Sequence, residues 1–307
     1  MTTTDALQRL LSSDSPVEWI RYRGLKKLAE AIYSPIEQNE GVDLLSEDWD
    51  NCIILDACRF DTFRDLEPEL SCSGTLSKVK SKGTRTVKFL ERNFPDEYND
   101  IVYVTVNPFV TTVLDDPFYK TEYVDATEKD KKAGAILPET VLNSALQANS
   151  DYPNKRLIIH FLQPHHPFVG ATQIEREFEK SDSGIRKKAR NPWRLFAKGE
   201  LRETKLRNAY RDNLRKVFPA VEKLSEELVG KTIVTSDHGE SFGDPSKSLP
   251  WRIYGHGGPR ISALVDVPWY ELEYDTRKNI KLDHSPAEQS GTSSSVQERL
   301  KKLGYIE

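Results

Sequence analysis

Short apolar runs alternate with amphipathic segments along most of the chain. Residues 51–56 contain an apolar run of the kind that parallel sheets bury on both faces, and residues 204–228 carry apolar positions at helical spacing. The expected strands are 51–56, 101–106, 155–162, 231–235, 261–265 and 267–272. The expected helices run from after Asp56 to Leu66, from Thr84 or Thr86 to Phe94, from Pro138 to Ala148, and over 204–228. This alternation predicts an α/β fold with a mostly parallel sheet covered on both faces, and residues 115–135 are predicted as a loop.

Residues 1–45 have the pattern of a helical extension in front of the main domain. Pro16 is placed to open a helix, and that helix carries four basic side chains between residues 21 and 27. Packing against the main domain and binding at a membrane interface are the two interpretations of this helix. A polar segment at 37–40 marks a boundary, so we expect an extension over 1–45 and a main domain over 46–307.

Composition and charge are those of an ordinary globular protein. The 307 residues are 37% hydrophobic and 30% charged with a formal net charge of −4, so no basic bias indicates a nucleic-acid partner. The three cysteines are an odd count, which favours a reducing compartment over a disulfide framework. The sequence shows neither a signal-peptide pattern at its start nor an apolar run of membrane-spanning length. We therefore expect a cytoplasmic protein without a transmembrane segment.

Two of the expected strands lead into acidic residues. Asp56 ends the first strand, and Asp237 and His238 follow a later one, with Glu240 two residues further on. Open α/β sheets bind ligands at the carboxyl ends of their strands, and carboxylate and imidazole groups are ligands for divalent metals. A turn or a helix cap is the alternative for each aspartate taken alone. Together these residues predict a metal site at one edge of the sheet.

Histidines cluster at the end of another expected strand. Half of the six histidines in the chain lie between residues 160 and 166. His160 lies within the strand itself, which favours a structural role for its ring. His165 is the first candidate for metal binding or general acid chemistry, and His166 is the second.

Two further polar residues are expected at the same edge of the sheet. His256 lies among glycines and outside any expected helix or strand, so its ring is free to face the site. Asn107 follows the strand 101–106 and is a candidate contact for substrate, with a turn asparagine as the alternative.

A hydroxyl nucleophile is expected where a helix begins after residue 83. Thr84 and Thr86 lie at this helix start, and Ser81 is a more distant third candidate. A threonine in such a position usually caps the helix, but the exposed N–H groups and the helix dipole also favour a phosphate or sulfate ester. A hydroxyl attacks such an ester when a metal or a base lowers its pKa. Arg85 adds positive charge for an anionic group.

Several of these segments resemble motifs of the alkaline phosphatase and sulfatase superfamily. Ser236-Asp-His-Gly-Glu-Ser-Phe-Gly243, followed by His256, is similar to its metal motif, and Ile53-Ile-Leu-Asp-Ala-Cys-Arg59 is similar to its first strand. His160-Phe-Leu-Gln-Pro-His-His-Pro-Phe168 resembles its central histidine motif, and Leu300-Lys-Lys-Leu-Gly-Tyr-Ile306 resembles its closing helix. The resemblance covers about residues 46–307. It implies an alkaline-phosphatase-like three-layer α/β/α sandwich that binds one or two divalent metal ions, which are Zn, Mn, Mg or Ca.

The resemblance also implies roles for individual residues. A first metal group that works with the hydroxyl nucleophile would consist of Asp56, Asp237 and His238. His165 and His256 would bind a second metal or the anionic oxygens of the substrate. The chain departs from the formylglycine sulfatases in two ways: Asp56 is followed by Ala57 and not by a second aspartate, and Cys58 lies only two residues after Asp56 without the Pro of their fixed pattern. Cys58 is therefore a poor candidate nucleophile.

The predicted function is metal-dependent hydrolysis or transfer of phosphate esters through Thr84 or Thr86. The hydroxyl would attack phosphorus in line, and water or an acceptor hydroxyl would then release the phospho-threonine. A sulfate-ester hydrolase on the same scaffold and a non-catalytic metal-binding protein are the alternatives. The expected substrate is an anionic ester of a small molecule, a glycan or a lipid headgroup, and the oligomeric state stays open. Candidate substrate contacts are Arg85, Asn107 and His166.

Overall fold

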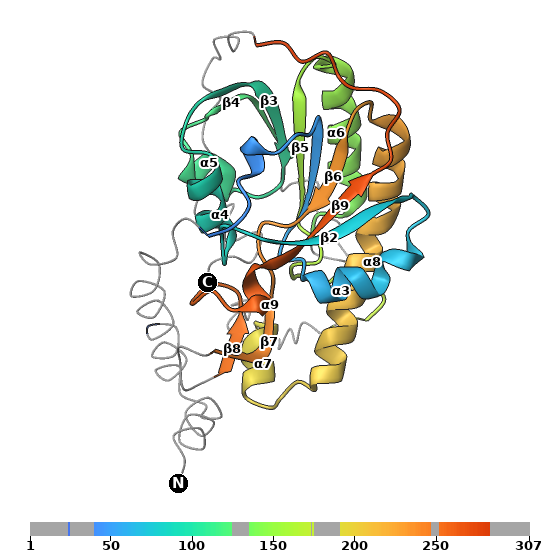
Figure 1. Ribbon diagram of the computed structural model, residues 1–307. Coiled ribbons are helices and arrows are strands. Elements are labelled where there is room, and N and C mark those ends of the chain that lie inside the picture. Colours follow the sequence, from blue (N-terminus) through green and yellow to red (C-terminus); the bar gives the residue numbers. More distant parts are fainter. Residues whose placement is uncertain are drawn as a thin grey trace, which may run out of the picture.

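A central sheet of seven strands organises the protein, in the order β2-β9-β6-β1-β5-β3-β4 (Figure 1). The computed structural model describes residues 24, 40–124, 135–172, 174, 191–246 and 252–282. The strands of the sheet are β1 (Asn51–Leu55), β2 (Gly74–Lys80), β3 (Tyr98–Thr105), β4 (Phe118–Tyr123), β5 (Arg156–Phe161), β6 (Thr232–Thr235) and β9 (Asp266–Leu272). Apart from residues 24 and 40–45, the predicted extension over 1–45 lies outside the described residues, as does the predicted closing helix at 300–306.

Five of these strands form one parallel block. β1 lies at the centre of the seven-stranded sheet and pairs in parallel with β5 and β6, while β3 pairs in parallel with β5 and β4. β9 is antiparallel to both β6 and β2. Every residue of β1 is buried, and burial on both faces of a parallel sheet is the reason that its sequence is a continuous apolar run. The predicted mostly parallel sheet is confirmed.

Helices cover the two faces of the sheet and form a separate hydrophobic core on each. The helices are α3 (Phe60–Leu66), α4 (Thr86–Asn93), α5 (Phe109–Val113), α6 (Pro138–Asp151), α7 (Pro192–Ala197), α8 (Glu203–Glu227) and α9 (Ser262–Val265). Ile53 and Leu55 share a core with α3, α6 and α8, whereas Cys52 and Ile54 share a core with α4 and α5. Successive side chains of a strand point to opposite faces of the sheet, which is why neighbouring residues of β1 belong to different cores. Helices on both faces confirm the three-layer α/β/α sandwich (Figure 1). None of the described helices has the length and apolar character to cross a membrane.

Several described elements differ from the expectation, among them two strands of the sheet and one short helix. β4 lies within residues 115–135, which were predicted as a loop, and β2 was not predicted at all. Both are edge strands whose side chains are mostly half-buried or exposed, so neither has a continuous apolar run. The strand predicted at 261–265 is wrong, because these residues form the short helix α9. An apolar run of this length fits a buried helical turn as well as a strand.

A two-stranded hairpin continues from the end of β6. β7 (Ser241–Pro245) and β8 (Arg252–Gly255) pair in an antiparallel manner. Gly255, at the end of the hairpin, has a φ of +74°, a conformation that residues with a Cβ rarely adopt. The hairpin lies between the Asp-His-Gly-Glu segment, which precedes β7, and His256, which follows β8.

Candidate metal centre

Polar side chains from three neighbouring strands meet at the carboxyl edge of the parallel block. Asp56 follows β1, Asp237 lies just beyond β6, and His160 lies near the end of β5. β1 separates the other two strands, and its Ile54 is paired with both Thr235 of β6 and His160 of β5. The side chains that follow these three strands are therefore close neighbours.

The first group of potential metal ligands consists of Asp56, Asp237 and His238, which are buried and offer ligand atoms within 4.8 Å of one another. His238 Nε2 lies 3.3 Å from Asp237 Oδ2 and 3.7 Å from Asp56 Oδ1. His238 Nδ1 lies 2.8 Å from the carbonyl oxygen of Gly239, and a carbonyl only accepts, so Nδ1 carries the proton. Nε2 is left with a lone pair close to both carboxylates, which is the form of histidine that binds metals.

Hydrogen bonds hold the Asp237 carboxylate by both of its oxygens. Oδ1 accepts from the backbone N–H groups of Ala57, at 3.0 Å, and His238, at 2.9 Å, while Oδ2 accepts from Thr86 Oγ1 at 2.7 Å. Burial raises the pKa of Asp237, but the neighbouring His238 and His160 together with these hydrogen bonds outweigh burial and lower it below the usual value. Asp237 is therefore ionised, as a metal ligand must be.

The turn after β1 is strained and held in place by helix α8. Ala57 has a φ of 62°, in the left-handed region that disfavours a residue with a Cβ. The N–H group of this residue reaches Asp237, and its carbonyl accepts a hydrogen bond of 2.6 Å from the Tyr210 hydroxyl. Tyr210 also accepts from the Arg59 backbone N–H at 2.9 Å. These contacts maintain the backbone conformation in which the Ala57 N–H group donates to Asp237, a potential metal ligand.

Thr86 lies beside the first metal group. Thr86 is the first residue of α4, and its Oγ1 lies 2.7 Å from Asp237 Oδ2 and 3.4 Å from His238 Nε2. Its side chain is buried with the group that it contacts. A hydroxyl in this position can be activated by an ion that the group binds.

The other two candidate hydroxyls have backbone partners. The Thr84 hydroxyl donates to the carbonyl of Gly258 at 3.2 Å, and the Thr84 carbonyl accepts from the N–H of Gly257 at 2.6 Å. The Ser81 hydroxyl donates to the backbone carbonyl of Asp237. Thr84 therefore supports the loop next to His256, and the structure brings only Thr86 of these three hydroxyls to the side chains of the first metal group.

A second group of potential metal ligands lies beside the first and consists of His165, Glu240 and His256. His256 Nδ1 is 3.2 Å from Glu240 Oε2. The ring centroids of His256 and His238 are 5.0 Å apart, so the two groups adjoin. The sequence places Glu240 near the predicted metal site, but the ligand set implied by the resemblance leaves it out, although its place in the Asp-His-Gly-Glu motif is the signal that could have identified its role.

The three predicted substrate contacts have different surroundings. His166 lies beside His165 with ring centroids 4.4 Å apart, and Arg85 is the N-cap residue of α4. The Asn107 side chain instead contacts a metal candidate, since its Nδ2 donates to Asp56 Oδ2 at 3.2 Å. This contact favours a role for Asn107 in orienting Asp56 over a role in substrate binding.

The structure supports the expectation that Cys58 is a poor nucleophile. Its side chain is fully buried, and burial, together with Asp61 and Asp237, raises the pKa of the thiol well above its usual value. A thiol in this environment stays protonated and inert.

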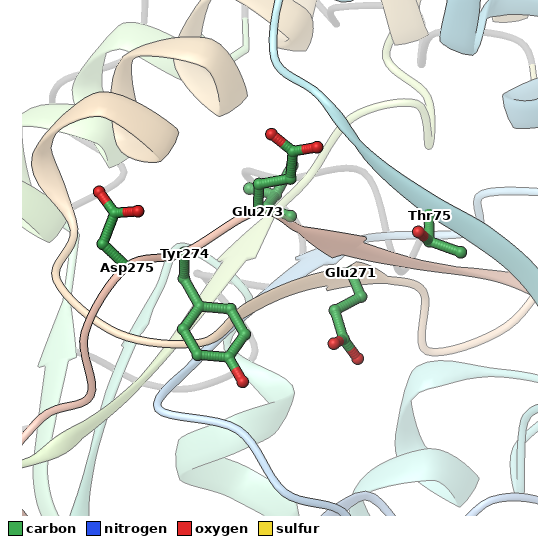
Figure 2. A pocket seen from close by; sticks show the side chains of 6 residues that line it. Thr75, Glu271, Glu273, Tyr274 and Asp275 are labelled. Atoms are coloured by element: carbon green, nitrogen blue, oxygen red, sulfur yellow. The ribbon is translucent and has the colours of Figure 1, made fainter.

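A surface pocket of about 610 Å³ lies far from the metal groups, beside Glu271, Glu273 and Asp275 (Figure 2). Glu271 pairs with Ile233 near the amino end of β6, which is the sheet edge opposite to Asp237. The carboxylates of the pocket would repel an anionic ester. The pocket is therefore not the substrate site that the metal groups require.

Acid is expected to destabilise the metal-free protein. Burial lowers the pKa of His160 to about 4, and burial also lowers the pKa of His165 and of His238. Unfolded histidines titrate near pH 6.5, so the unfolded state binds more protons between about pH 6.5 and about pH 4. We expect the free energy of unfolding in urea to fall over this window, by on the order of 3 kcal/mol from His160 alone. A free energy that stays constant or rises on acidification would contradict the burial of these neutral rings.

Comparison with known proteins finds similarity in overall structure only. No protein-family model and no curated protein matches the chain. The C-terminal periplasmic domain of EcEptC from Escherichia coli in complex with Zn has 13% sequence identity and a TM-score of 0.44, with 78% of this chain and 76% of that chain covered. A phosphonate monoester hydrolase of Agrobacterium radiobacter has 13% identity and a TM-score of 0.40, with 72% and 67% covered. The resemblance to the alkaline phosphatase and sulfatase superfamily therefore rests on sequence motifs alone, and those of residues 53–59, 160–168 and 236–243 lie at one edge of the sheet.

Proposed function

We propose that the protein is a metal-dependent phosphoesterase or phosphotransferase in which Thr86 is the nucleophile. The observation that carries the proposal is the Thr86 hydroxyl, whose Oγ1 lies 2.7 Å from Asp237 Oδ2 and 3.4 Å from His238 Nε2. A buried hydroxyl in contact with two potential metal ligands can be activated by the ion that they bind.

The side chains of the first group fit a divalent ion. Asp56, Asp237 and His238 supply two carboxylates and one imidazole, and all three are buried. Two buried carboxylates repel one another, and a divalent cation compensates both charges. Oxygen ligands together with one imidazole suit Zn or Mn. When bound, the ion would lower the pKa of the Thr86 hydroxyl and stabilise negative charge on the transferred group.

Thr86 would form and then lose a bond to phosphorus. In the first step, a bond forms between Thr86 Oγ1 and phosphorus, the bond from phosphorus to the ester oxygen breaks, and the hydroxyl proton ends on the leaving alcohol. In the second step, water or an acceptor hydroxyl attacks phosphorus, and Thr86 regains a proton. Because Thr86 is the first residue of α4, the N–H groups and the dipole of this helix support negative charge at the transferred group. His165, Glu240 and His256 are available for a second ion or for the substrate.

Sulfate-ester hydrolysis at the same centre is the alternative reaction. Burial of Cys58 gives no support to a formylglycine route, so Thr86 would have to serve as the nucleophile for sulfate esters too. An anionic ester of a small molecule, a glycan or a lipid headgroup stays the expected substrate, and the cytoplasm stays the expected location.

A substrate and metal panel tests the proposed reaction. Protein stripped with a chelator is supplied with Zn, Mn, Mg or Ca and assayed with an aryl phosphate monoester, an aryl phosphodiester and an aryl sulfate. We expect turnover that depends on added metal and that is faster for at least one phosphate ester than for the sulfate ester. Faster turnover of the sulfate ester would favour the alternative reaction, and turnover that does not depend on metal would contradict the proposed centre.

A further inference from the structure

A buried tyrosine and histidine lie next to the two carboxylates of the first metal group. Tyr103 of β3 and His160 of β5 are on adjacent strands, and the Tyr103 hydroxyl lies 2.9 Å from His160 Nδ1. Both residues are buried, with 0% and 1% of their surface exposed. The sequence predicts a structural role for His160, and it does not single out Tyr103.

The second ring nitrogen of His160 lies close to one oxygen of each carboxylate. His160 Nε2 is 3.9 Å from Asp237 Oδ2 and 4.0 Å from Asp56 Oδ2. Within the part of the chain that the structure describes, this nitrogen has no hydrogen-bond partner. Buried polar atoms almost always have one, so a nitrogen left between two buried carboxylates points to a role in the site beyond packing.

The Tyr103 hydroxyl determines which nitrogen of His160 carries the proton. If Nδ1–H donated to the hydroxyl, the hydroxyl hydrogen of Tyr103 would be buried without an acceptor among the described residues, and the Nε2 lone pair would face two negative groups. If the hydroxyl donates to Nδ1, the tyrosine hydrogen is satisfied and Nε2–H directs its positive end toward both carboxylates. The second arrangement avoids the cost of an unsatisfied buried donor.

We propose that His160 is a positioning residue whose Nε2–H, oriented by Tyr103, holds the carboxylates of Asp56 and Asp237 side by side for metal binding. This inference rests on the proposed function, because it assigns the first group to a metal ion. The distances of 3.9 and 4.0 Å exceed those of hydrogen bonds, so the effect is an electrostatic attraction in a buried, weakly screened environment. Groups that orient metal ligands in this way typically change metal affinity by about ten- to a hundredfold.

Four variants distinguish this role from packing. His160→Leu removes the N–H group, and His160→Gln keeps an amide N–H at a similar reach. Tyr103→Phe removes only the hydroxyl that orients the ring. Tyr270→Phe is the matched control, because it removes a hydroxyl that donates to the Cys72 carbonyl at 2.8 Å on the edge pair of β2 and β9. Mn²⁺ binding is measured by calorimetry for each variant, and circular dichroism verifies folding.

We expect the His160→Leu variant to bind Mn²⁺ about ten- to a hundredfold more weakly than the wild type. The His160→Gln variant is expected to recover most of this loss, the Tyr103→Phe variant to show a smaller loss, and the Tyr270→Phe variant to match the wild type. Wild-type affinity in the Tyr103→Phe variant together with no rescue by His160→Gln would overturn the inference. That comparison stands even if the His160→Leu variant does not fold.

Nitrogen-15 chemical shifts of the imidazole rings test the tautomer directly. The resonances of His160 are identified by their loss in the His160→Gln variant, and they are compared in metal-free and Zn²⁺-loaded protein. We expect a protonated Nε2 and an unprotonated Nδ1 in both states. An Nε2 that is unprotonated or bound to zinc would overturn the inference. Neither measurement depends on turnover. A protein that meets these expectations but transfers no phosphate would therefore overturn the proposed function and leave the role of His160 unaffected.

Discussion

The Thr86→Val variant is expected to lose turnover of phosphate esters by at least about a thousandfold while it retains its metal. The hydroxyl of Thr86 contacts Asp237 Oδ2 at 2.7 Å, and valine keeps the branched shape of the side chain without the attacking oxygen. The measurement is the steady-state rate at saturating metal, with metal content determined on the same sample. Mass spectrometry of the wild-type protein stopped during turnover is expected to detect a phosphate on the peptide that contains Thr86.

Two control variants make this result specific to Thr86. Thr232→Val removes a buried hydroxyl that donates to the Gly230 carbonyl at the opposite end of β6, so it tests the effect of losing any buried threonine hydroxyl. Thr84→Val removes the other candidate, whose hydroxyl donates to Gly258. We expect a stability loss of about 1 kcal/mol in each and a much smaller effect on turnover than in Thr86→Val. Turnover that survives Thr86→Val and disappears in Thr84→Val would assign the reaction to Thr84.

The second large effect is expected from Asp237→Asn, which should weaken metal binding by at least about a hundredfold and abolish turnover with it. The asparagine side-chain oxygen can still accept from the N–H groups of Ala57 and His238, as Asp237 Oδ1 does. The fold is therefore expected to persist while the anionic ligand is lost. Titration calorimetry with Mn²⁺ and elemental analysis of the purified variant measure the effect.

Asp212→Asn is the matched control for Asp237→Asn. Asp212 lies on α8 and forms an ion pair of 3.0 Å with Arg215, so its replacement also removes one carboxylate from a network of polar contacts. We expect this variant to bind metal as the wild type does. Unchanged metal binding in Asp237→Asn would show that the first metal group is assigned to the wrong residues.

The sequence predicts the centre of the sheet better than its edges, for a physical reason. β1 is buried along its whole length, so its apolar run is continuous and easy to detect. β2 and β4 are the edge strands, and their polar, partly exposed residues have no such run. At 261–265, a short apolar segment suits a helical turn as well as a strand, and only its contacts in the fold determine which one forms.

In the candidate site, the sequence likewise predicts which residues lie near one another but not which side chains are in contact. Asp56, Asp237 and His238 were identified because they follow apolar strands, and parallel pairing brings such chain ends together. The sequence could not separate Thr84 from Thr86, since the difference is which of two nearby hydroxyls turns toward Asp237. The contacts of Asn107 with Asp56 and of Tyr103 with His160 likewise depend on distant strands.

An anomalous-difference map from crystals grown with Mn²⁺ tests the central claim most directly, because it locates the ion without reference to any substrate. A metal centre formed by Asp56, Asp237 and His238 predicts an anomalous peak in contact with the carboxylate oxygens of both aspartates and with His238 Nε2. A map at saturating Mn²⁺ whose peaks all lie away from these three side chains would contradict the account.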